Sequence, residues 1–218
     1  MKLLLTSGGF TNKSIIKALR YLTGKPFKEQ SLAFIPTAAN VEDGDKGWLI
    51  DDMNNAKKLG FSSIDVVDIS AISREMGEKR LRAVDIIMVG GGNTFHLMYW
   101  INKSGLSGIM KELLETKVYV GISAGSMVMA KSLELSQASK LYYEDVGPSE
   151  LDRGLGYVDF QVRPHLNSEW FKKVRDEYLK ELAKEIKDTI YAIDDATAIQ
   201  VVDEKISLIT EGTWIQYN

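Results

Sequence analysis

Val120-Gly121-Ile122-Ser123-Ala124-Gly125-Ser126 joins a β-rich run to a helix-compatible run at residues 127–133. A Gly-x-Ser-x-Gly pattern between a strand and a helix is typical of a nucleophile elbow, a turn so sharp that larger side chains two residues before or after the serine would clash. We expect this turn to project Oγ of Ser123 above the sheet edge, near backbone N–H groups that stabilise an oxyanion. The alternative interpretation is that these small residues only pack a helix against a strand.

Strand and helix patterns alternate along the chain before this turn. Short aliphatic or β-branched runs indicate strands at residues 3–6, 32–36, 64–69, 85–89 and 117–122. Apolar residues at helical spacing predict helices at residues 12–22, 48–59, 72–84, 94–103 and 107–116. Such alternation is typical of a parallel sheet with helices on both faces. We therefore predict an α/β fold of three layers, αβα, around a mostly parallel, doubly wound sheet.

The pattern changes after the turn. Residues 168–186 are charged but carry one apolar stripe, which predicts a helix. Closely spaced strands follow at residues 190–193, 198–202 and 206–209, and the chain ends near Trp214-Ile215. Turns at Asp203-Glu204 and Glu211-Gly212 favour a short antiparallel C-terminal addition. Residues 138–156 are the least regular stretch and fall next to the presumed site, where long loops often carry function.

Length and composition narrow the class of protein. A chain of 218 residues can form one well-buried domain, so we expect a single domain over residues 1–218. Its 27 basic and 30 acidic residues are interspersed and give a net charge of −3, which offers no basic stripe for nucleic acid and no polybasic membrane patch. No run reaches the roughly 18 apolar residues that span a bilayer, and residues 1–7 are too short for a signal peptide core, so we expect a cytoplasmic protein. Because the chain has no cysteine, a nucleophile must be oxygen or nitrogen.

Two histidines are the candidates for a general base. His165 follows a probable strand and precedes a helix opened by Asn167 or Ser168, and therefore lies at a strand's C-terminal end, where open α/β sheets gather their ligands. His96 falls within the predicted helix 94–103, so we interpret it as a packed or surface residue. His165 is therefore the favoured base for Ser123.

A glycine run, Gly90-Gly91-Gly92-Asn93-Thr94, follows an apolar strand and opens a helix. Its N–H groups could cradle a phosphate, but the run lacks the Lys-Ser/Thr ending of a P-loop and the spacing of a dinucleotide site. A second oxyanion donor facing Ala124 is a better functional interpretation, because glycine lets the backbone approach a substrate carbonyl closely. A purely structural strand-to-helix turn has equal weight.

The acid of a triad is left open by these patterns. The acids between Ser123 and His165 are Glu134, Glu144, Asp145, Glu150, Asp152 and Asp159. After His165, the pair Asp194-Asp195 closes a predicted strand, and Asp195 is favoured because a strand end would place it level with Ser123 and His165. Neither histidines nor acids show metal-ligand spacing, so we expect no metal and no cofactor.

Four motifs occur in order along the chain: Val89 to Phe95 around the glycine run, Gly121 to Ser126, Arg163-Pro164-His165, and Tyr191 to Ala198 around the acid pair. In this the chain resembles the aspartyl dipeptidase (peptidase E) family of serine peptidases, to which cyanophycinases are related. The resemblance spans nearly the whole length. It implies a class I glutamine amidotransferase-like fold, with Ser123 as nucleophile, His165 as base and then acid, and N–H groups near Gly91 or Gly92 and Ala124 as the oxyanion hole.

The chain departs from the family pattern at the acid. The family commonly carries an Asn-Asp pair shortly after the elbow, whereas Ser136-Gln137-Ala138 stands there in this chain. The family's other candidate, a glutamate, is matched by Asp195, which is one methylene shorter. A preference for an N-terminal aspartate, implied by the resemblance, also needs a cation near the substrate carboxylate, and Arg163 and Arg175 are the candidates.

The resulting hypothesis is a cytoplasmic serine peptidase that cleaves small peptides through an acyl-enzyme. An α/β-hydrolase-type esterase is one alternative and would place its acid between Ser123 and His165. A non-catalytic protein that binds a small metabolite on the same fold is another. A homodimer is also compatible with the chain. Trp48 and Trp170 could line its interface, although we favour a place for both in the core.

Overall fold

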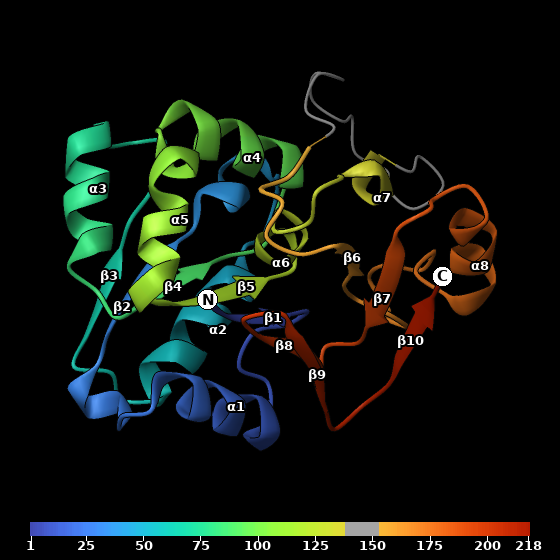
Figure 1. Cartoon of the computed structure of the whole chain (residues 1–218), viewed down its shortest axis with the longest axis horizontal. Coiled ribbons are helices and arrows are strands. Elements are labelled where there is room, and N and C mark those ends of the chain that lie inside the picture. Colours follow the sequence, from blue (N-terminus) through green and yellow to red (C-terminus); the bar gives the residue numbers. More distant parts are fainter. Residues whose placement is uncertain (138–152) are drawn as a thin grey trace.

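A seven-stranded sheet forms the centre of the structure, a computed structural model that describes residues 1–137 and 153–218 (Figure 1). Five strands run parallel: β1 (Lys2–Thr6), β2 (Ser31–Ile35), β3 (Ser63–Val66), β4 (Ile86–Val89) and β5 (Val118–Ile122). Two antiparallel strands follow at one edge, β8 (Thr197–Val202) and β9 (Lys205–Thr210). The order is β3-β2-β4-β5-β1-β8-β9, which places β1 between β5 and β8.

Helices cover both faces of this sheet, which confirms the predicted α/β architecture. On one face lie α1 (Lys13–Thr23) and α2 (Gly47–Lys58), and on the other lie α3 (Arg74–Arg82), α4 (Thr94–Lys103) and α5 (Leu106–Thr116). The short 3-10 helices η1 (Phe27–Glu29) and η2 (Thr37–Val41) flank β2. Since both faces are covered, the central strands are buried on both sides: Leu3 and Leu5 of β1 pack toward one helical layer and Leu4 toward the other.

Side-chain caps explain where three helices begin. The Asn12 side chain accepts a hydrogen bond from the Ile15 N–H at 3.0 Å, and Asn93 accepts one from the His96 N–H at 2.9 Å. Ser73 caps α3 in the same way. Each cap satisfies an N–H group that a helix N-terminus otherwise leaves without a partner.

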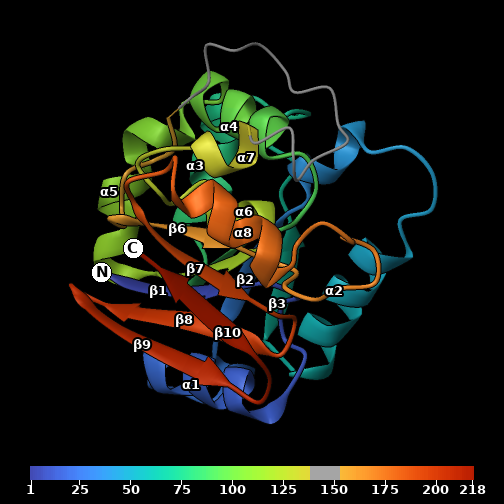
Figure 2. The ribbon, with the colours of Figure 1, turned by 90° about the vertical axis from the view of Figure 1, so that its right-hand side faces the viewer.

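A second, three-stranded sheet corrects the prediction for the C-terminal strands. It consists of β6 (Phe160–Arg163), β7 (Thr189–Ile193) and β10 (Trp214–Tyr217) in the order β10-β7-β6, at the end of the molecule that faces the viewer in Figure 2. Only β8 and β9 form the predicted antiparallel addition to the main sheet, whereas β7 pairs in parallel with β6. The physical reason is a separate apolar cluster on this side of the molecule, in which Ile190 and Ala192 of β7 pack with α8 (Asp176–Ala183), whereas Ile193 packs in the main core.

Two predicted helices are shorter than the sequence indicated. After Ser123 the helix α6 covers only Ala124–Met127, and the chain then makes a bridge between Ala130 and Val158 before α7 (Glu134–Gln137). Helix α8 begins at Asp176, because residues 166–175 form a loop instead of the predicted first helical turns. Most of the irregular stretch predicted at 138–156 lies outside the described residues.

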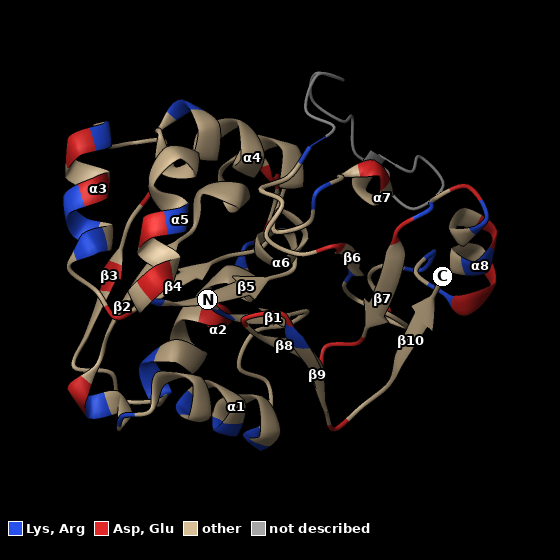
Figure 3. Ribbon diagram, viewed as in Figure 1, with Lys and Arg blue, Asp and Glu red and all other residues tan. Residues whose placement is uncertain are grey.

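Acidic and basic residues are interspersed over the helices (Figure 3). Ion pairs on α3 connect Arg80 to Asp65 of β3, and Arg82 to Glu78 and to Glu112 of α5. They tie the outer helices to the edge of the sheet. Among the described residues, no helix has both the length and the apolar character that crossing a membrane requires.

Candidate active site

Ser123 stands at the end of the central strand β5, in a strained turn. Its backbone has φ 48° and ψ −110°, outside the regions that L-residues prefer, and its N–H donates to the Thr6 carbonyl at 3.0 Å. The chain enters α6 at the next residue. Strand, strained serine and helix start therefore follow one another without an intervening loop.

The two glycines that flank Ser123 are required by close contacts. A Cβ added at Gly121 would lie 2.6 Å from the Ser126 nitrogen, and one at Gly125 would lie 2.1 Å from the Val89 carbonyl oxygen. Both contacts are with backbone atoms, which cannot move away without disrupting β4 or α6. Any side chain at either position would therefore open the turn that carries the serine.

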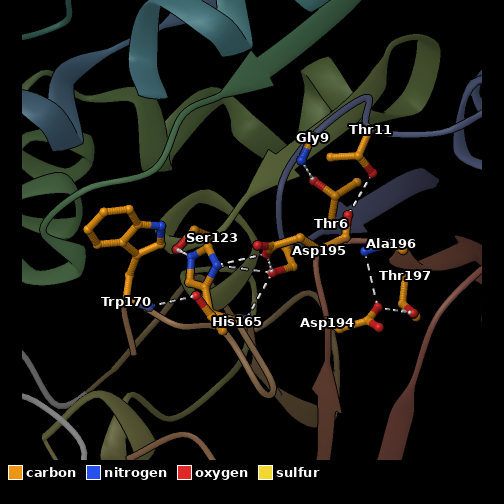
Figure 4. Close-up of polar contacts among 12 residues, drawn as sticks. Thr6, Gly9, Thr11, Ser123, His165, Trp170, Asp194, Asp195, Ala196 and Thr197 are labelled. Atoms are coloured by element: carbon orange, nitrogen blue, oxygen red, sulfur yellow. Dashed lines mark hydrogen bonds and ion pairs between the residues drawn. The ribbon is translucent and has the colours of Figure 1, made fainter. Parts of the chain in front are cut away.

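His165 connects Ser123 to Asp195 (Figure 4). Its Nε2 lies 2.9 Å from Oγ of Ser123, and its Nδ1 lies 2.8 Å from Oδ1 of Asp195. The histidine follows β6, has a positive φ of 64° and stacks its ring on Phe171, with centroids 4.4 Å apart. The structure thus brings together three residues that are up to 72 positions apart in sequence (195 minus 123).

Asp195 is held at the point where the chain leaves β7 for β8. The adjacent Asp194 fixes this turn by accepting hydrogen bonds from the N–H of Ala196 at 3.1 Å and from the Thr197 hydroxyl at 2.7 Å. Burial alone would raise the pKa of Asp195, but hydrogen bonds from His165 and Ser7 and the charge of the His165 ring bring it below its usual value. Asp195 is therefore ionised near neutral pH and suited to orient and stabilise a protonated His165.

Ser7 is a site residue that sequence reasoning missed. It lies at the end of β1, is fully buried, and its hydroxyl donates to Asp195 Oδ1. Oγ of Ser7 also accepts the His165 backbone N–H at 2.8 Å and lies 3.3 Å from His165 Nδ1. Ser7 therefore holds the histidine backbone and the acid together. One sequence pattern could have pointed to Ser7, namely a serine followed by Gly8-Gly9 at the end of a central parallel strand.

The backbone around Ser123 offers hydrogen-bond donors. A Cβ added at Gly91 would lie 3.2 Å from Ser123 Cβ, which places the glycine run directly against the serine. Gly92 has φ 123°, and a Cβ there would lie 2.4 Å from the Ala38 carbonyl oxygen, so only glycine fits. Within the described residues, the N–H groups of Gly91 and Gly92 make no backbone hydrogen bond, and Ala124 is the first residue of α6, where an N–H has no partner within the helix. These three N–H groups can therefore donate to an oxyanion.

The other candidates from the sequence lie elsewhere. Arg163 is completely buried, and Arg175 donates to the carbonyls of Ser168, Phe171 and Val174, so it fastens the loop after His165. His96 lies on α4, where burial lowers its pKa. The prediction that Trp48 and Trp170 pack in the core is wrong, because they are 39% and 88% exposed.

Few acids compete with Asp195 for the third position. Glu134 is exposed, and Asp159 forms an ion pair with Lys131. Glu144, Asp145, Glu150 and Asp152 lie outside the described residues. Over residues 1–137 and 153–218, no group of three or more acids and histidines is arranged to hold a metal ion.

Comparison with known proteins identifies relatives over most of the chain. The family model described as "Peptidase family S51" matches residues 3–209. An uncharacterized peptidase of Pasteurella multocida is 30% identical over 185 residues, which cover 81% of this chain and 84% of that protein. A peptidase E of Shewanella oneidensis is 33% identical over 104 residues, covering 47% of this chain and 42% of that protein.

Solved structures match the whole fold. A crystal structure of a Listeria monocytogenes EGD-e protein, provisionally identified as a peptidase E, superposes with a TM-score of 0.80 at 26% identity and covers 97% of this chain and 98% of that one. A peptidase from an acI-B1 Actinobacterium superposes with a TM-score of 0.65 at 20% identity, covering 99% and 96% of the two chains. The second match supports the fold alone.

Proposed function

The chain belongs to peptidase family S51 and is a serine-type peptidase, and from this premise we propose that Ser123, His165 and Asp195 form its catalytic triad. The observation that carries the proposal is the continuous path of hydrogen bonds from Ser123 Oγ through both ring nitrogens of His165 to Asp195. A path of this kind lets one imidazole accept the serine proton while the carboxylate stabilises the resulting imidazolium.

In the proposed reaction, Oγ of Ser123 attacks the carbonyl carbon of the scissile amide while its proton passes to Nε2 of His165. The tetrahedral intermediate collapses when the C–N bond breaks and His165 returns that proton to the leaving amine. Water then loses a proton to His165, its oxygen attacks the acyl carbon, and the bond to Oγ breaks as Ser123 regains the proton. The N–H groups of Gly91 or Gly92 and of Ala124 are the proposed oxyanion donors.

The proposed substrates are small peptides, with N-terminal aspartyl dipeptides as one class to be tested. The two arginines considered for binding an aspartate side chain do not support that class. Arg175 is engaged by three carbonyls of its own loop, and Arg163 is completely buried. A direct comparison of Asp-Leu with Ala-Leu hydrolysis therefore decides the specificity.

The esterase alternative requires an acid between Ser123 and His165. The contact of Asp195 with His165 Nδ1 favours the peptidase order, in which the acid follows the histidine. Asp195→Asn should lower kcat by about 10³-fold, because the wrong histidine tautomer would face Ser123. The matched change Asp159→Asn should leave kcat unchanged, whereas the reverse result would favour the esterase order.

A fluorophosphonate probe tests the nucleophile. Mass spectrometry of the wild-type protein should find one adduct on Ser123, because His165 activates this serine alone, and the adduct should be absent from Ser123→Ala and His165→Ala. Hydrolysis of Asp-Leu and Ala-Leu is measured on the same samples. Peptide hydrolysis that persists in Ser123→Ala would refute the proposed triad.

A further inference from the structure

Two side chains of helix α2 lie beside the glycine turns that flank Ser123. Trp48 and Asp52 are four residues apart and therefore lie on the same side of the helix. A Cβ added at Gly91 would lie 3.8 Å from Cζ3 of Trp48, and one added at Gly9 would lie 3.5 Å from Oδ1 of Asp52. Trp48 thus stands at the glycine run, and Asp52 stands one helical turn further on.

Asp52 lies close to the residue that precedes Ser123. The same Cβ position at Gly9 lies 3.0 Å from Cδ1 of Ile122, the residue that precedes Ser123. Gly8, the neighbour of Gly9, lies against Asp195, since a Cβ added there would be 3.1 Å from Cβ of Asp195. Asp52 and Asp195 therefore both lie against the Gly8-Gly9 turn.

The Asp52 carboxyl lacks a cation. It is half-buried, and among the described residues neither of its oxygens has a hydrogen-bond or ion-pair partner. Burial, with the negative charges of Asp51 and Asp195, raises the pKa of Asp52 to about 7. A half-buried carboxylate beside another carboxylate costs free energy that a bound cation would offset.

We propose that Asp52 binds the free α-ammonium group of the substrate's N-terminal residue, so that the enzyme removes the first residue from unblocked small peptides. This inference rests on the proposed function, because it requires Ser123 to attack the carbonyl of that residue. The α-nitrogen lies only about 2.5 Å from the attacked carbonyl carbon, two bonds away. The ammonium group is therefore the one cation that every unblocked peptide brings to this place, whatever its side chains.

The test compares Ala-Leu with N-acetyl-Ala-Leu. In the wild type, acetylation should lower kcat/KM by about 30-fold or more, as expected for the loss of a half-buried charge pair. In Asp52→Asn this discrimination should shrink to within about threefold, because no charge remains to be matched. The matched control Asp51→Asn removes an exposed neighbouring charge and should discriminate as strongly as the wild type.

If Asp52→Asn hydrolyses peptides too slowly to assay, the affinity for the two peptides is measured instead. Calorimetry with Ser123→Ala should detect tighter binding of Ala-Leu than of its acetylated form, and Ser123→Ala/Asp52→Asn should bind both equally. Thermal melting at pH 5 checks that the variants fold.

Two outcomes overturn the inference while leaving the proposed function intact: equal cleavage of both peptides by a wild-type enzyme that is labelled on Ser123, or undiminished discrimination in Asp52→Asn. Cleavage of N-acetyl-Lys-Leu at the rate of Ala-Leu would also overturn it, because Asp52 would then bind a basic side chain. Absence of both labelling and hydrolysis in the wild type would instead refute the proposed function.

Discussion

At the scale of single residues, Ser7 holds two residues of the proposed triad in place with one hydroxyl group. One buried hydroxyl joins the backbone of His165, which has the unfavourable φ of 64°, to the carboxylate of Asp195. Ser7→Ala should lower kcat by about 10- to 100-fold with little change in KM, because a hydrogen bond to a charged group is lost and the histidine is less well held. Steady-state kinetics on Ala-Leu measures both constants.

Thr11→Val is the matched control for Ser7→Ala. The Thr11 hydroxyl contacts the backbone carbonyl of Asp195 at 2.6 Å and leaves its carboxylate untouched. This variant should retain nearly wild-type kcat. Equal losses in the two variants would mean that the turn around Asp195, and not the hydroxyl of Ser7, determines the rate.

Asp52 should also make stability depend on pH. Its pKa in the folded protein, about 7, lies above the usual value of an aspartate in an unfolded chain, so the folded state holds the proton more tightly. The stability that this proton provides is complete below the unfolded pKa of about 3.9, declines as the pH rises from there, and is lost above about pH 7. The melting temperature of Asp52→Asn, which cannot ionise, should therefore exceed that of the wild type by more at pH 8 than at pH 5. An equal difference at both pH values would contradict this origin.

Ser123 and His165 could be singled out from the sequence, and Asp195 could be favoured among several acids, because each stands at a strand end within a recognisable local pattern. Ser7 could not, because its role is defined by two partners 158 and 188 residues away. Asp52 was missed for a related reason. Its environment depends on Gly9 and Asp195, which are distant in sequence, whereas the pattern of its own helix is that of an ordinary amphipathic helix.

At the scale of elements, the loop at residues 166–175 determines how the histidine is presented. Arg175 donates to the carbonyls of Ser168, Phe171 and Val174, and Phe171 stacks on the His165 ring. Arg175→Ala should lower kcat several-fold and speed amide exchange in this loop, because three hydrogen bonds that fold it are lost. Hydrogen-exchange mass spectrometry and kinetics measure the two effects, with Lys172→Ala as the exposed control. A kcat loss without faster exchange would contradict this explanation.

Two glycines in helices should respond in opposite ways to alanine. Gly108 of α5 has no atom within 4 Å of an added Cβ, so Gly108→Ala should stabilise the protein by about 1 kcal/mol through helix propensity. Gly125→Ala should prevent folding or destabilise severely, because its Cβ would meet the Val89 carbonyl oxygen at 2.1 Å. Urea titration measures both, and a tolerated Gly125→Ala would mean that the turn at Ser123 can open.

Element prediction succeeded where periodicity alone decides structure. The predicted helix at 94–103 coincides with α4, whose Asn93 cap and apolar stripe are both local signals. The predicted helix at 168–186 lost its first half because Phe171 and Val174 pack toward His165 and α8 instead of along one stripe. Likewise, β7 pairs outside the main sheet because it packs with α8 in a separate apolar cluster, and the spacing of residues within the strand does not indicate this contact.

At the scale of the whole molecule, the proposed triad spans two sheets. Ser123 follows β5 of the main sheet, whereas His165 and Asp195 follow β6 and β7 of the second sheet. Val162 and Ile193 of the second sheet pack in the main core, so we propose that residues 1–218 unfold as one domain. Far-UV circular dichroism and fluorophosphonate labelling should therefore lose signal at the same urea concentration. Labelling lost at lower urea would mean that the second sheet detaches first.

The position of β1 between β5 and β8 has a consequence for synthesis on the ribosome. Ser7 leaves the exit tunnel 188 residues before its hydrogen-bond partner Asp195. At about 5–20 residues per second, that interval lasts on the order of 10 seconds or more. Until Asp195 emerges the proposed triad is incomplete, so the growing polypeptide and its neighbours are not exposed to an active peptidase.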